Sequence, residues 1–167
     1  MSEEAIKDLL GSNGENKLLW DKLGNEINGP SVDKIVSILK DAMINNPQNI
    51  LTLDIIDYIL DKGNKEIIDL IAKKEFLDHF LNLLKAEANS GIENEKKVIY
   101  LTKKWANKFQ NNPNYPIFQE NFNLLKNNGI FFPPDDYIIE TYTKYIGQNQ
   151  NNNNFNQNNY YYKFRLF

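Results

Sequence analysis

The helical spacing of apolar residues is the feature that most restricts what this chain can fold into. Apolar side chains recur three and four positions apart in almost every segment before Gly147, and short clusters of Asn, Gly and Pro separate the segments. This period places the apolar side chains on one face of a helix. No segment alternates apolar and polar residues with turn signals, as a half-buried strand does. The sequence therefore predicts an all-helical protein with little or no sheet.

Eight segments carry this spacing, and short connectors between them predict antiparallel neighbours stacked as a bundle or solenoid. Residues 49–62 are apolar around much of the circumference, which is typical of a buried central helix. The strip 130–134 should fold back on the helices, because Phe131 and Phe132 are costly to leave in water. The apolar faces lie in residues 3–10, 19–27, 32–43, 49–62, 67–71, 76–84, 98–109 and 117–125.

The composition changes sharply after residue 146, and this change sets the expected domain boundary. Residues 1–146 form the predicted helical domain, ending in a short helix at 135–146 whose Asp135 and Asp136 suit its positive N-terminal end. Residues 147–167 form a tail in which 148–159 are almost all Asn and Gln. Such a tract cannot bury enough surface to fold, so we expect disorder there. Residues 160–167 are aromatic, and we favour a fragment of a longer chain over a docking motif.

Charge and cysteine content exclude several function classes. The net charge of -3 gives no global field that would attract nucleic acid, and acids dilute the lysine pairs at 73–74, 96–97 and 103–104. These pairs are more typical of a solvated face than of a phosphate footprint. The absence of cysteine excludes disulfides, thiolate nucleophiles and cysteine-containing metal sites. No secretory signal or membrane-length apolar run is visible, so we expect a cytoplasmic protein.

The residues needed for catalysis are not gathered anywhere in the sequence. His79 is the only histidine, and it lies between Phe76 and Phe80 with no serine nearby. The serines lie mainly at expected helix ends or loops, where capping explains them. There is no glycine-rich phosphate loop and no carboxylate spacing typical of a metal site. We predict that the chain is not an enzyme and holds no cofactor.

Three stretches between Leu23 and Pro133 carry a resemblance to a known family. The first two are the apolar block at residues 50–56 with Lys62-Gly63-Asn64, and the turn at residues 72–77. The third and most specific joins Lys104-Trp105-Ala106-Asn107-Lys108-Phe109 to Asn112-Pro113, and then to Gly129-Ile130-Phe131-Phe132-Pro133. Together they resemble the VHS domain of endosomal and Golgi sorting adaptors. The resemblance implies a right-handed superhelix of eight helices, in the ENTH/VHS superfamily.

The same resemblance implies adaptor work peripheral to endosomal or Golgi membranes in intracellular transport. Members of the family bind ubiquitin or ubiquitinated cargo, and one subgroup binds sorting-signal peptides. Related superhelical domains bind phosphoinositides, which here would meet the lysine pairs. A further alternative is a helical reader of the phosphorylated polymerase tail, although the third stretch favours the VHS domain.

The resemblance places two candidate sites. Ubiquitin-binding members carry a Trp on the second helix and an aliphatic residue four positions later, where this chain has Lys17 and Asp21. Trp20 lies three residues away, so the tentative ubiquitin site comprises Trp20, Asp21 and Asp61. A structural role for Trp20 is an equal alternative.

The second candidate site is the peptide groove that the family forms between its sixth and eighth helices. Its basic residues fall on Lys74 and Glu75, its Asn on Asp78, and its aliphatic walls on Leu81 and Leu124. The carboxylates of Glu75 and Asp78 would repel an acidic peptide. We therefore expect this groove to take a peptide of another kind, not the acidic-dileucine signal.

Overall fold

The computed structural model describes residues 4–132, so the expected helix at 135–146 and the expected tail at 147–167 lie outside it. Within this range the chain is all-helical and contains no strand, which confirms the predicted fold class. The helices are α1 (Glu4–Leu10), α2 (Lys17–Glu26), α3 (Val32–Asn45), α4 (Thr52–Lys62), α5 (Lys65–Ile71), α6 (Lys74–Asn82), the 3₁₀ turn η1 (Ala86–Ala88), α7 (Ile92–Lys108) and α8 (Pro116–Asn127).

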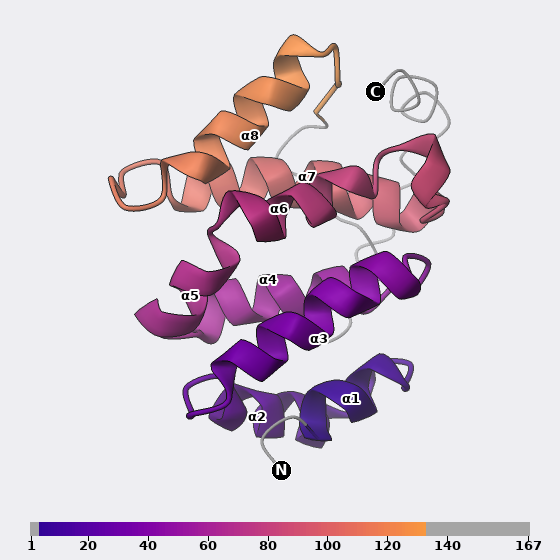
Figure 1. Ribbon diagram of the computed structural model, residues 1–167, viewed down its shortest axis with the longest axis vertical. Helices are drawn as coiled ribbons and strands as arrows, with labels where there is room; N and C mark the ends of the chain where they lie inside the picture. The colour runs from indigo at the N-terminus through magenta and orange to yellow at the C-terminus, as the bar shows by residue number, and fades with distance from the viewer. Residues whose placement is uncertain (1–3, 133–167) are drawn as a thin grey trace.

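The helices stack into a superhelix two rows deep (Figure 1). In the figure α1, α3 and α6 lie in front of α2, α4 and α7, and α8 lies across the end opposite the N-terminus. The main contacts join α1 to α2, α3 to α4, α5 and α6, α4 to α7, and α7 to α8. Each helix thus packs on its near neighbours, as expected of a helical solenoid.

Helix α4 lies at the centre, as its apolar circumference predicts. It packs against α3, α5 and α7, and all residues from Thr52 to Asp57 are buried. The buried set includes two carboxylates, Asp54 and Asp57, which the sequence pattern gave no reason to place in the interior. The interface between α4 and α7 is therefore partly ionic.

An aromatic row on α7 forms the core of the C-terminal half. Trp105 is 1% exposed, and its ring lies 4.8 Å from that of Phe80 and 6.0 Å from that of Phe118. The half-buried ring of Phe109 stacks on Phe118 at 4.6 Å. The apolar face predicted in residues 98–109 thus points inward at Trp105 and Phe109.

Two local predictions differ from the structure. The strip after α8 folds back through Ile130 and Phe132, whose ring lies 4.6 Å from that of Phe122, but Phe131 is 43% exposed. Ser31 begins α3 without a hydrogen bond from its side chain, whereas Asn64 caps α5 by accepting from Ile67 N. At these two helix starts, therefore, the asparagine side chain caps and the serine side chain does not.

Candidate interaction site

Trp20 lies in the core instead of on the predicted ubiquitin-binding surface. Its side chain is 3% exposed, and its indole Nε1 donates to the carbonyl of Gly14 at 2.8 Å. The ring lies 5.2 Å from that of Tyr58 on α4, and the Tyr58 hydroxyl donates to the Trp20 carbonyl. The cause is the helical period, because Trp20 shares one face of α2 with Leu23 and Ile27. A side chain this buried offers a partner almost no area.

The outward side of α2 carries a leucine that the sequence analysis did not select. Leu18 is 76% exposed, the highest value among the large hydrophobic side chains of residues 4–132. Beside it Lys17 and Asp21, both exposed, form an ion pair at 3.3 Å. A signal was present, because Leu18 falls outside the inward stripe of Trp20, Leu23 and Ile27. Asp21 is therefore on the surface next to Leu18, and not next to an exposed Trp20.

Asp61, the third residue of the predicted ubiquitin site, belongs to an ionic seam between α4 and α7. Its carboxylate lies 2.6 Å from Lys108 Nζ and 3.7 Å from Lys104 Nζ. One turn earlier, Asp57 accepts from Lys104 at 2.7 Å and from the Trp105 indole at 2.8 Å. Asp61 remains partly accessible, but Lys104 and Lys108 hold it toward α7.

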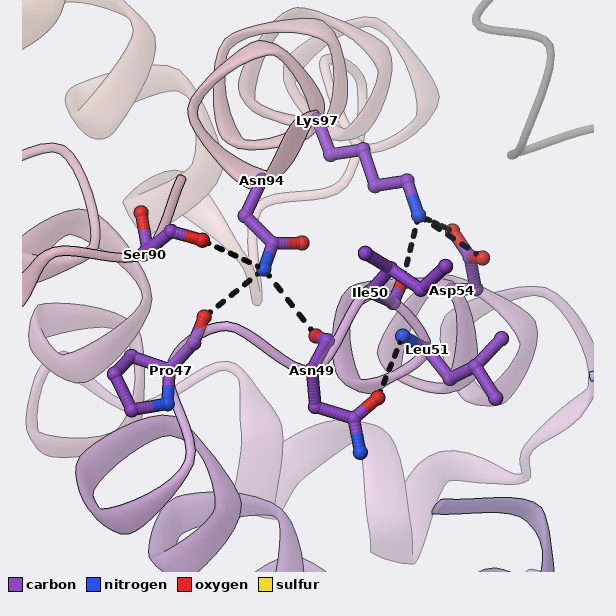
Figure 2. A network of polar contacts seen from close by, with 8 residues as sticks. All are labelled: Pro47, Asn49, Ile50, Leu51, Asp54, Ser90, Asn94 and Lys97. Atoms are coloured by element: carbon purple, nitrogen blue, oxygen red, sulfur yellow. Dashed lines mark hydrogen bonds and ion pairs between the residues drawn. The ribbon is translucent and has the colours of Figure 1, made fainter. Parts of the chain in front are cut away.

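At the start of the seam, Lys97 and Asp54 form a buried pair (Figure 2). Lys97 Nζ lies 3.2 Å from Asp54 Oδ1 and also donates to the carbonyl of Ile50. Lys96 and Lys97 are 7% and 0% exposed, so the prediction that this lysine pair forms a solvated face is wrong. The reason is that α7 begins at Ile92, earlier than its apolar pattern suggests, and turns Lys97 toward α4.

Burial dominates the electrostatics of this seam. Loss of hydration raises the pKa of Asp54 to about 7, although Lys97 opposes this rise. Desolvation also raises the pKa of Asp57, against the effect of Lys104 and of the Trp105 hydrogen bond. Both carboxylates are therefore held by specific donors in a setting that disfavours their charge.

The side chain of Asn94 joins the start of α7 to the loop between α3 and α4. Figure 2 shows its Nδ2 directed at three carbonyl oxygens, those of Pro47 at 2.9 Å, Ser90 at 3.2 Å and Asn49 at 3.3 Å. The amide of Asn49 in turn donates to the carbonyl of Leu10 at 2.8 Å. These contacts connect the end of α1, the α3–α4 loop and the loop before α7.

The predicted peptide groove is divided between core and surface. Lys74 and Asp78 form an ion pair on α6 at 2.7 Å, and Glu75 pairs with Lys40 of α3 at 3.0 Å. Leu81 is 6% exposed and belongs to the core, whereas Leu124 on α8 is 46% exposed. Of the two predicted apolar walls, Leu124 is the one that offers area to a peptide.

No group of residues in the described range suggests catalysis or metal binding. His79 is half-buried on α6, between the buried Phe76 and Phe80. Between residues 4 and 132 there is no cluster of three or more His, Asp or Glu side chains that could hold a metal ion. Over the same range, no helix is both long and apolar enough to cross a lipid bilayer.

The comparison with known families agrees with the geometry. The sequence profile of the VHS domain family matches residues 29–129, from within the α2–α3 loop through α8. No solved structure gives a significant match to the chain. The matched range includes helices α3 to α8 and therefore the whole ionic seam between α4 and α7. This chain belongs to the VHS domain family, within the ENTH/VHS superfamily.

Proposed function

We propose that this VHS domain is a non-enzymatic adaptor module of vesicle trafficking that binds ubiquitin or ubiquitinated cargo through the outward side of α2. VHS domains are protein-interaction modules, and membership of this family supports an adaptor role. We expect the protein to work on the cytoplasmic side of endosomal or Golgi membranes. The observation that carries the proposal is the exposed Leu18 beside the Lys17–Asp21 ion pair.

The surroundings of Leu18 suit an anchor for a small apolar interface with a polar rim. The Asn16 side chain caps α2 by accepting from the Leu18 backbone N at 3.0 Å, which fixes the start of the helix. The buried Trp20 joins α2 to Gly14 and to Tyr58 from beneath. A partner would therefore meet a preformed helix surface, which lowers the entropy lost on binding.

A titration of isotope-labelled protein with ubiquitin tests this proposal. We expect amide shifts to move along α2 at millimolar ubiquitin, and we expect Leu18→Asp to abolish them. Leu124→Asp is the matched control, because it removes another exposed leucine at the far end of the superhelix. Shifts that survive in Leu18→Asp, or none at all in the wild type, would refute this site.

The exposed Leu124 favours a sorting-signal peptide as a second ligand. Of the residues predicted to form the peptide groove it is the exposed leucine, and the charge of Lys74 on α6 is already engaged by Asp78. The carboxylates there favour a neutral or basic peptide over an acidic one. Fluorescence anisotropy with acidic-dileucine peptides and with neutral and basic leucine-containing peptides, repeated on Leu124→Asp, measures this preference. Equal binding by the variant would contradict it.

The structure gives less support to phosphoinositide binding. Of the lysine pairs that suggested it, Lys97 is buried against Asp54 and Lys104 is paired with Asp57. An exposed basic surface is what attracts anionic headgroups. Co-sedimentation with phosphoinositide liposomes at low salt would reveal such binding, and we expect none.

A further inference from the structure

Asp54 is a buried carboxylate with few donors. It is 1% exposed, and Lys97, itself 0% exposed, lies 3.2 Å from both of its oxygens. Within residues 4–132, Oδ1 has the ion-pair contact but accepts no well-directed hydrogen bond. An ionised carboxylate can accept about four hydrogen bonds. The charge of Asp54 is therefore poorly compensated in this position.

The charged groups around Asp54 come from two helices. Lys97 of α7 favours the ionised form of Asp54, while Asp57, one turn along α4, opposes it. Lys104 acts mainly on Asp57, with which it pairs at 2.7 Å. None of the charged residues on α2 (17–26), α3 (32–45) or α5 (65–71), the other helices in contact with α4, is buried. Asp54 thus depends on Lys97 for the stability of its charge.

We propose that Asp54 and Lys97 form a proton-operated clasp that sets how firmly the start of α7 holds the α3–α4 loop, residues 46–51. Lys97 donates to the Ile50 carbonyl, and Asn94, one turn earlier, holds the carbonyls of Pro47 and Asn49. When Asp54 takes up a proton, Lys97 loses its counter-ion. A buried ammonium without a partner charge is unstable, so Lys97 moves toward solvent and releases Ile50.

The clasp operates at neutral pH and alters an accessible edge. The pKa of Asp54 lies at about 7, where small changes in pH alter its charge. Because this folded-state pKa is above the unfolded one, the contribution of Asp54 to stability is fully present below about pH 4 and is lost as the pH rises through about 7. The side chain of Ile50 is 42% exposed, so its release changes the surface that this edge offers to a partner.

The test is a pH titration of the full chain by NMR between pH 5 and 9. We expect the amides of residues 47–51 and 92–98 to share a midpoint near pH 7 in the wild type. Asp54→Asn should abolish this midpoint, and Asp61→Asn, at a half-exposed position of the same seam, should keep it. His79→Gln is the essential control, because histidine ordinarily titrates near this range.

A second readout covers the case in which Asp54→Asn does not fold. In wild-type protein with ¹³C-labelled aspartate, the carboxyl carbon of Asp54 should titrate near pH 7. A carboxyl resonance that titrates below pH 5 would overturn the proposal. So would an amide midpoint that disappears in His79→Gln, or one that persists in a folded Asp54→Asn.

Discussion

Replacing Asn94 with leucine tests how the contacts of Figure 2 hold α7 against the α3–α4 loop. Asn94 is 1% exposed, and its Nδ2 faces three carbonyl oxygens between 2.9 and 3.3 Å away. Nδ2 carries two hydrogens, so at most two of these contacts are full hydrogen bonds at one time. The amide Oδ1 has no hydrogen-bond partner among residues 4–132.

These counts set the expected magnitudes. Leucine has a similar size, removes both donated bonds and leaves buried carbonyls unsatisfied, at about 1–3 kcal/mol for each acceptor that stays dry. Removing the unpaired Oδ1 and burying an apolar group offset part of this, so we expect Asn94→Leu to cost about 1–3 kcal/mol. Asn94→Asp places a carboxylate among carbonyl oxygens and should cost about 3–5 kcal/mol at pH 7.

Urea unfolding followed by circular dichroism and tryptophan fluorescence measures the difference. With an ordinary urea dependence, the leucine variant should lose roughly 1 M in its midpoint. Asn107→Leu is the control, because Asn107 is exposed on the same helix and should change stability little. If Asn94→Leu proves as stable as the wild type, the three carbonyls do not need a donor and the reasoning fails.

Gly14→Ala and Trp105→Phe probe the packing inside the superhelix, and Gly129→Ala is the control for the first. Gly14→Ala should lower the free energy of unfolding by about 2–4 kcal/mol, because Gly14 has φ +78° and an added Cβ would lie 2.4 Å from Leu51 Cδ2. Gly129 has a similar φ of +83° but open space around it, so Gly129→Ala should cost only about 1 kcal/mol. Thermal unfolding of both variants measures the difference. Trp105→Phe should lower the free energy of unfolding by about 2–4 kcal/mol, because it removes the 2.8 Å hydrogen bond to the buried Asp57 and leaves a cavity. A urea midpoint equal to that of the wild type would contradict this.

The helices and their inward faces could be predicted because helical periodicity is a local property. The inward row of Trp105 and Phe109 follows from their spacing alone. The same rule applied to Trp20 would have put it in line with Leu23 and Ile27, in the core. Its tentative assignment to a binding site came instead from the family resemblance, and the period proved the better guide.

The start of α7 could not be predicted because its environment is set by distant residues. Residues 93–97 are all polar, so no apolar pattern marks them as helix, yet Asn94 to Lys97 are buried. Apart from Ser90, the described partners of Asn94 and Lys97 lie in the α3–α4 loop and in α4, 43 to 47 positions away. The similar spacing of aspartates in residues 54–61 and of lysines in residues 97–108 is a weak signal for ion pairs between the two helices. It is weak because a single sequence contains many other pairs of segments with matching acidic and basic residues.

The ionic seam explains how α4 keeps one alignment with α7. Apolar faces of similar shape can slide by a helical turn at modest cost, because one leucine substitutes for another. A slip here would move Lys97 toward Asp57 and leave Asp54, which is 1% exposed, without its counter-ion. An uncompensated buried charge costs several kcal/mol, far more than the pair itself contributes to stability. The carboxylates of α4 thus favour one register of α4 against α7, because the lysines of the seam each have a different aspartate as their closest partner.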